Sequence, residues 1–406
     1  MLIKRVLQNA NIATSLPTGD YHAPFQYFPL HDIVIEGAYI KAVLPHQPAS
    51  TYNCEIEDLQ GALVTAGLID CHTHLIFAGN RAHEWERRQQ GIPYSQIAKE
   101  GGGINQTVKA TRQASMEELA SLAQPRLQRL IQEGVTTIEC KTGYGLNLED
   151  ERKQLLVADQ LAQHYPIEII KTLLSAHTIP SEFKNNPDDY VNLICQKIIP
   201  TLWQEKAFSA IDIFCETVGF SIAQSTKILQ TAKALGIPIK GHTEQLSNLG
   251  GSALIASFNG LSVDHIEYLD EQGIQAIKQS NTTAVLLPFA YYFLREKQCP
   301  PIDLLRQYQV PIAISTDFNP GTAPFTSIHW AMNMACVQFG LTIEEAWAGV
   351  TWNAAKALGL THSHGCIAPG YLADLLVWDA ERPVDIIYEV GSNPLVQRIF
   401  RGKNTL

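Results

Sequence analysis

The sequence lacks the features that mark several classes of protein. Its eight cysteines form no C-x-x-C pair, so neither a disulfide framework nor a cysteine-based zinc site is indicated. It has no excess of basic charge, because acidic residues outnumber Lys and Arg and give a net charge of −10. Its longest apolar stretch, residues 284–294, contains a proline and two tyrosines and is too short to cross a bilayer. Neither a nucleic-acid partner nor a membrane is therefore expected.

The start of the chain also shows no apolar segment followed by a small-residue cleavage site. Several cysteines lie within apolar runs, as small buried side chains do in a reducing compartment. We therefore expect a cytoplasmic protein. Its 406 residues, of which 46% are hydrophobic, favour one large domain with an accessory domain.

Eight short apolar segments recur along the chain, and longer stretches compatible with helices separate them. The segments are continuous apolar runs rather than alternations, as is typical of parallel strands covered on both faces. One intervening stretch, residues 115–134, opens with a Ser-x-x-Glu capping box. This α/β pattern predicts a (β/α)₈ TIM-like barrel, for which a homodimer is a reasonable expectation. The segments are residues 63–70, 135–141, 167–177, 210–216, 237–242, 261–267, 282–288 and 310–316.

The two ends of the chain have a different pattern. Residues 32–44 contain two strand-like runs joined around Gly37, and the last forty residues contain two more, without helical periodicity. We expect both ends to build one small, discontinuous β-sandwich domain. The predicted limits are 1–65 and 366–406 for this domain and 66–365 for the barrel.

The pair His72 and His74 follows the first predicted strand. Alternation along an extended segment places both imidazoles on one side, with Cα atoms about 6–7 Å apart, so that both can reach one metal. When the position of the pair in the fold is ignored, a chance His-x-His pair on the surface is as common as a metal site. Barrel folds, however, place catalytic groups at the carboxyl ends of their strands.

Three more polar residues occupy equivalent positions. His242, His265 and Asp317 each lie at the end of an apolar run. His265 alone could equally be a core histidine, but convergence of several strand ends on one mouth favours a site. Imidazoles and a carboxylate suit Zn²⁺ or iron, with an open position for a water that the metal activates.

Longer motifs resemble a known family. The segments AGLIDCHTH (66–74) and GCIAPGYLADLLVWD (365–379) resemble the amidohydrolase superfamily. A narrower resemblance, to the imidazolonepropionase family, is found in the segments FAGNRAHEWERR, KTGYGL, LSAHTIP, GHTEQLSNLGG, DHIEYL and STDFNPGTAP. The resemblance implies hydrolysis of the cyclic amide of 4-imidazolone-5-propanoate to N-formimino-L-glutamate, a step of histidine degradation.

The resemblance also implies roles for individual residues. Asp317 would carry a proton from water to the leaving nitrogen, and His265 would polarise the substrate carbonyl. We expect one divalent ion, Zn²⁺ or Fe²⁺/Fe³⁺, because the fourth predicted strand lacks the lysine that bridges two metals in binuclear members. The implied metal ligands are His72, His74, His242 and Asp317. The implied substrate-binding residues are Arg81, Tyr144, His177, Gln245, Asn319, Gly321 and Thr322.

One position departs from the family pattern. Some members have a glutamate three residues after the histidine of strand five, whereas this chain has Gln245. A glutamine can orient the ring but cannot act as a base, so base catalysis falls on Asp317 unless Glu244 takes part. Strand alternation would aim Glu244 towards the His242 side if the strand continued that far.

Two alternative functions are compatible with parts of the pattern. The first is a deaminase of a heterocyclic amine with the same fold and metal. Arg81 and His177 favour a substrate with a carboxylate arm, although a lone loop arginine is ordinarily only solvated. The second is a barrel that has lost activity and serves as a scaffold, but all four implied metal ligands are present.

Overall fold

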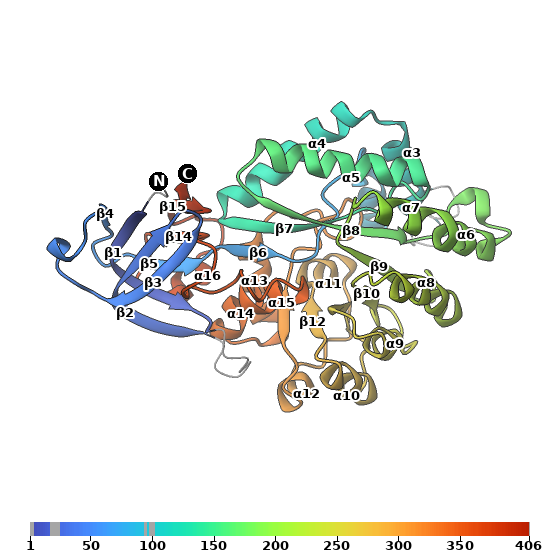
Figure 1. The fold of residues 1–406 in the computed structure, drawn as a ribbon. Coiled ribbons are helices and arrows are strands. Elements are labelled where there is room, and N and C mark those ends of the chain that lie inside the picture. Colours follow the sequence, from blue (N-terminus) through green and yellow to red (C-terminus); the bar gives the residue numbers. More distant parts are fainter. Residues whose placement is uncertain (1–3, 17–24, 93–95, 97–101, 406) are drawn as a thin grey trace.

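The computed structural model describes residues 4–16, 25–92, 96 and 102–405. Two eight-stranded sheets organise the chain, a parallel barrel sheet and a mixed sheet built from both ends (Figure 1). The predicted α/β class, with a (β/α)₈ barrel and a small β domain from both termini, is confirmed. No described helix is long and apolar enough to cross a membrane.

The barrel strands follow one another in sequence order and pair in parallel. Seven of the eight predicted segments correspond to single strands, whose ends lie within about three residues of the predicted limits. The strands are β6 (Leu68–Asp70), β7 (Val135–Lys141), β8 (Glu168–Ala176), β9 (Ala210–Cys215), β10 (Lys240–Thr243), β11 (Ser262–His265), β12 (Thr283–Leu286) and β13 (Ile312–Ile314).

The first predicted strand, 63–70, was wrong as a single element. It divides at Gly67 into β5 (Leu63–Ala66), which joins the terminal sheet, and β6, which joins the barrel. A side chain at Gly67 would collide with Thr136, and the Gly67 amide donates to the carbonyl of Asp374 at 2.8 Å. The break therefore lies where the two sheets meet.

Hydrogen bonds beyond the first and last barrel strands close the barrel. The amide of Asp317 donates to the carbonyl of His72 at 3.0 Å, and the amide of His74 donates to the carbonyl of Phe318 at 2.9 Å. The segments that follow β6 and β13 therefore lie side by side. Closure brings polar side chains from opposite ends of the barrel sequence to one mouth.

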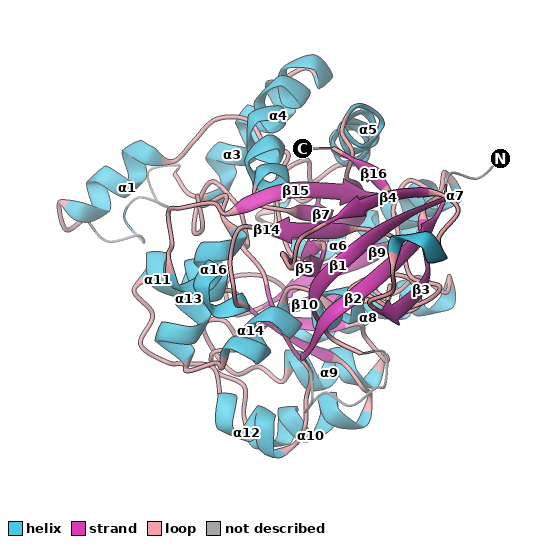
Figure 2. Cartoon of the chain, turned by 90° about the vertical axis from the view of Figure 1, so that its left-hand side faces the viewer, coloured by secondary structure: helices cyan, strands magenta, loops and turns pink. Residues whose placement is uncertain are grey.

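Helices surround the barrel strands (Figure 2). The predicted capping box at Ser115 and Glu118 is present at the start of α4, and both of its hydrogen bonds form. The helices are α1 (Ala82–Gln89), α3 (Ile104–Gln113), α4 (Met116–Gln132), α5 (Leu148–His164), α6 (Pro187–Leu193), α7 (Ile199–Gln204), α8 (Ile222–Ala234), α9 (Gly251–Ser257), α10 (Glu271–Gln279), α11 (Pro288–Leu294), α12 (Ile302–Gln307), α13 (Ile328–Phe339), α14 (Ile343–Gly349), α15 (Trp352–Ala357) and α16 (Pro383–Tyr388). A π-helical stretch, Ile194–Ile198, joins α6 to α7, and 3-10 turns lie at Ala49–Thr51 and Ser181–Phe183.

The terminal sheet joins the two ends of the chain. Its order is β16-β15-β14-β5-β1-β2-β3, with β4 also paired to β1, so that β14 from the C-terminal end lies beside β5 from the N-terminal end. It has its own apolar core. The domain limits 1–65, 66–365 and 366–406 stay a prediction. The remaining strands are β1 (Lys4–Thr14), β2 (Gln26–Glu36), β3 (Tyr39–Pro45), β4 (Glu55–Asp58), β14 (Leu375–Trp378), β15 (Leu395–Phe400) and β16 (Lys403–Asn404).

Candidate active site

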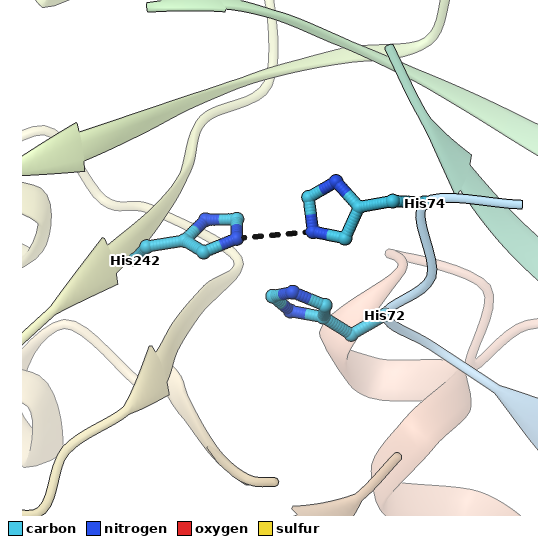
Figure 3. A group of neighbouring side chains, drawn as sticks. All are labelled: His72, His74 and His242. Carbon is cyan, nitrogen blue, oxygen red and sulfur yellow. Dashed lines mark hydrogen bonds between the residues drawn. The ribbon is translucent and has the colours of Figure 1, made fainter. Parts of the chain in front are cut away.

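Three imidazoles converge at the mouth of the barrel. His72 and His74 follow β6, and His242 lies near the end of β10. One ring nitrogen of each histidine lies within 4.8 Å of those of the other two. Figure 3 shows the three rings pointing toward one another, with Nε2 of His242 3.5 Å from Nε2 of His74. Such a set can hold a metal ion.

Asp317 adds a carboxylate to this group. Its Oδ1 atom lies 3.4 Å from Nε2 of His72 and 3.5 Å from Nε2 of His74. Ligand atoms at tetrahedral corners, each about 2.1 Å from a zinc ion, are about 3.4 Å apart. These two separations therefore fit Asp317 and the His72–His74 pair as ligands of one small divalent ion, whereas the group of mutually close ligand atoms among the described residues contains the three histidines alone.

Hydrogen bonds on the far side of two rings fix which nitrogen faces the centre. The Nδ1–H group of His72 donates to Asp264 at 2.6 Å, and that of His242 donates to Asp212 at 3.0 Å. With the proton on Nδ1, the neutral form of each ring has a free lone pair on Nε2, as a metal ligand requires. Nε2 of His72 is buried and has no hydrogen-bond partner in the described part of the chain. An unsatisfied buried nitrogen is costly, and a metal ion would satisfy it.

Burial also sets the charges in the site. Desolvation, with smaller contributions from neighbouring cationic groups, lowers the pKa of His72 and His74 well below the ordinary 6.5, which keeps both rings neutral. Burial raises the pKa of the Asp317 carboxyl well above 3.8, opposed by a hydrogen bond from the Asn319 side chain. A bound cation would favour the ionised carboxylate.

His265 lies at the end of β11, beside the rings of His72 and His242. Its ring centroid is 5.5 Å from that of His242 and 5.8 Å from that of His72. Its Nδ1 atom is buried without a partner among the described residues. The backbone is strained here, with φ of 83° at His265 and 68° at Ile266, and β-branched residues rarely adopt such values.

His177 and Tyr144 form an aromatic wall beside the cluster. The His177 ring stacks on His74 with centroids 5.2 Å apart, and Tyr144 lies 5.4 Å from His177. The Nδ1–H group of His177 donates to the carbonyl of Gly143 at 3.1 Å. Burial lowers the pKa of His177 to about 3, so this ring is neutral and its Nε2 is an acceptor.

Arg81, which precedes α1, is held by an acidic partner. Its Nε atom donates to Glu84 at 2.9 Å, and the other Glu84 oxygen accepts from the amide of Gly103 at 2.8 Å. The guanidinium lies against Gly321, where a Cβ atom would lie only 2.9 Å from Cζ of Arg81. Gly321 is not among the residues with a positive φ, so it provides space for Arg81 rather than a left-handed turn.

The turn after Asp317 is held by its own side chains. Oδ1 of Asn319 accepts from the amides of Gly321 and Thr322 at 2.8 Å each. The Asn319 amide group donates to the carbonyl of Asp317 at 2.7 Å and to the Thr322 hydroxyl at 2.9 Å. These groups therefore shape the loop that presents Asp317.

The structure decides the alternative left open for Glu244. Strand β10 ends at Thr243 and Glu244 has a φ of 51°, so strand alternation no longer applies. Its carboxylate accepts from the amides of Gly251 and Ser252 at 2.7 and 2.8 Å at the start of α9. Glu244 thus stabilises a helix end, whereas the neighbouring Gln245 is buried after the same strand.

Sequence reasoning missed the charged residues beneath the histidines. Two lysines and three carboxylates from four barrel strands lie there with almost no solvent exposure. The sequence does indicate these residues, because charged residues inside strands that are covered on both faces need partners. They are Glu139, Lys141, Asp212, Lys240 and Asp264.

Comparison with known proteins identifies the family of the chain. The model of the amidohydrolase family matches residues 63–405. Imidazolonepropionase of Photorhabdus laumondii is 57% identical over 400 residues, covering 98% of this chain and 96% of that protein. Imidazolonepropionase of Salmonella schwarzengrund is 56% identical over 398 residues, covering 98% and 97%.

A solved structure shows the same fold at a greater distance. The 5-methylcytosine deaminase from Klebsiella pneumoniae, liganded with 5-fluorocytosine, superimposes with a TM-score of 0.75. The match covers 100% of this chain and 97% of that one, at 14% identity. This likeness supports the fold alone. The family match and the two close relatives show that the chain belongs to the amidohydrolase family of hydrolases and, within it, to the imidazolonepropionases.

Proposed function

We propose that the chain hydrolyses 4-imidazolone-5-propanoate to N-formimino-L-glutamate in histidine degradation. The observation that carries this proposal is the convergence of His72, His74, His242 and Asp317 in a chain 57% identical to an imidazolonepropionase. Water adds to the ring carbonyl carbon, the bond from that carbon to the ring nitrogen breaks, and the nitrogen receives a proton. The product carries a new carboxylate and an open formimino group.

The proposal includes one metal ion, Zn²⁺ or Fe²⁺/Fe³⁺, held by these four residues. When bound there, a divalent metal supplies the Lewis acidity that makes a water nucleophilic near neutral pH. A single ion is proposed because β9 contributes no lysine to bridge two metals, and Lys171 on β8 pairs with Asp159 at 2.5 Å.

Asp317 and His265 move and stabilise charge in the proposed reaction. Asp317 takes a proton from the attacking water and passes it to the leaving ring nitrogen. Its position against His72 and His74 supports this role. His265, whose ring lies beside that of His242, stabilises the negative charge that develops on the carbonyl oxygen.

The remaining residues bind and orient the substrate. Arg81, held by Glu84, pairs with the propanoate carboxylate. Gln245 orients the ring, and Tyr144 and His177 hydrogen-bond the ring and its arm. Contacts of Asn319, Gly321 and Thr322 with substrate stay predictions, as do the homodimer and the cytoplasmic location.

The alternative functions receive less support. Likeness to a deaminase structure at 14% identity gives no information about the substrate, whereas both close relatives are imidazolonepropionases. A scaffold without activity would not need to keep a buried ligand set with Nε2 of His72 unsatisfied.

Turnover of freshly prepared substrate tests the proposal. Protein of known metal content is mixed with imidazolone propanoate, and the loss of imidazolone absorbance is followed alongside ammonia release. We expect absorbance to fall without ammonia, and chelated protein to be inactive until metal is restored. Ammonia release from a heterocyclic amine, or equal activity in chelated protein, would refute the proposal.

A further inference from the structure

A closed network of charged side chains lies directly behind the histidine cluster. Its members come from strands β7, β9, β10 and β11, and each is at most 1% exposed. Burial of charge is expensive unless every charge is paired, so a network of this size needs a reason beyond stability. The members, two lysines and three carboxylates, are Glu139, Lys141, Asp212, Lys240 and Asp264.

Lys141 contacts all three carboxylates of the network. Its Nζ atom lies 2.5 Å from Asp212, 2.8 Å from Glu139 and 3.6 Å from Asp264. The backbone amide of Lys141 also donates to the carbonyl of Thr73, between His72 and His74, at 2.8 Å. Strand β7 is thereby attached to the segment that carries two of the proposed ligands.

Two of those carboxylates also hold ligand histidines. Asp212 accepts from Nδ1 of His242 through one oxygen and from Lys141 through the other. Asp264 accepts from Nδ1 of His72 through the same oxygen that faces Lys141. The ammonium of Lys141 thus lies between two negative groups that would otherwise repel each other.

We propose that Lys141 is a positioning residue that holds His72 and His242 together as ligands of one ion, through Asp264 and Asp212. This inference rests on the proposed metal site. Removal of the ammonium lets the two carboxylates move apart and frees the two rings to rotate. Metal affinity then falls even though every ligand is still present.

Lys240 supplies a matched control from the same network. Its Nζ atom lies 2.8 Å from Glu139 and 3.0 Å from the carbonyl of Cys71. It is 3.9 Å from Asp264, and no hydrogen bond or ion pair with Asp212 is found among the described residues. Lys240→Met removes the same buried charge as Lys141→Met but leaves the Asp212–His242 pair with its ammonium.

The experiment measures Zn²⁺ affinity by competition with a chromophoric chelator. We expect Lys141→Met to weaken Zn²⁺ binding about 10–100-fold. Lys141→Arg should keep most of the wild-type affinity, and Lys240→Met should lose less affinity than Lys141→Met. Thermal unfolding of the metal-free variants serves as the structural readout, and we expect similar losses for both methionine variants. Equal Zn²⁺ affinity in Lys141→Met and wild type, or an equal loss in Lys240→Met, would overturn the inference.

A second variant, Asp212→Asn, tests the same inference if Lys141→Met folds poorly. Asp212→Asn keeps the size of the side chain but weakens the contact with Lys141, and we expect the same 10–100-fold loss of affinity. Wild-type affinity in Asp212→Asn would also overturn the inference. Failure of the wild-type protein to bind Zn²⁺ would instead refute the metal centre of the proposed function.

Discussion

Gly321→Ala should impair substrate binding through Arg81. A Cβ atom at this position would overlap the Arg81 guanidinium, which is the movable end of a long side chain, so the fold should tolerate the change. An Arg81 side chain displaced by this methyl group would no longer form an ion pair with the substrate carboxylate. A hydrogen-bonded charge pair contributes about 1.5–3 kcal/mol, and each 1.4 kcal/mol is about tenfold in affinity. We therefore expect KM to rise about 10–100-fold, with a smaller change in kcat.

A double-mutant cycle shows whether Arg81 carries this effect. Steady-state kinetics are measured for Gly321→Ala, Arg81→Ala and the double variant, with thermal unfolding as the control for folding. If the glycine acts only by making room for Arg81, Gly321→Ala adds little to Arg81→Ala. Full additivity of the two losses, or an unchanged KM in Gly321→Ala, would refute the reasoning.

Three further predictions concern two other residues of the site, Asp317 and Gln245, and one residue outside it, His329. Asp317→Asn should lower kcat about 10²–10⁴-fold while the three histidines retain metal, as kinetics and metal analysis together would show; unchanged kcat would refute its role as proton carrier. Gln245→Glu should keep turnover within about tenfold of wild type if Gln245 orients the ring, whereas loss of a base in Asp317 variants should not be rescued through Glu244, which is bound to the start of α9. Burial lowers the pKa of His329 to about 4, below its unfolded value, so protons bind the unfolded chain first and stability falls as the pH drops from 6.5 towards 4. His329→Asn should remove about 2 kcal/mol of the loss between pH 7 and pH 5 in urea unfolding, and an unchanged pH slope would contradict this.

The sequence predicted the parts of the fold that depend on local pattern. Continuous apolar runs identified seven barrel strands, and β7 at 135–141 has the predicted limits. The histidines at strand ends were recognisable because nothing in an apolar run explains a polar residue at its end. Their meeting point follows from closure, since a closed barrel brings the tips of its first and last strands together.

Other features depend on contacts that no local pattern contains. The division of 63–70 at Gly67 arises from close packing against Thr136, which is distant in sequence. Glu244 turns away because the strand ends one residue before it. The pairing of Lys141 with Asp212 depends on strand order, because these residues are 71 positions apart. Charged residues within the predicted strands did indicate buried partners, but not which ones.

X-ray absorption spectroscopy of the metal-loaded protein, combined with metal analysis, tests the central claim most directly. We expect one ion per chain, bound by three imidazole nitrogens and by oxygen, and loss of one imidazole from its coordination in His242→Ala. Two ions per chain, sulfur in the coordination sphere, or an unchanged spectrum in His242→Ala would contradict the account.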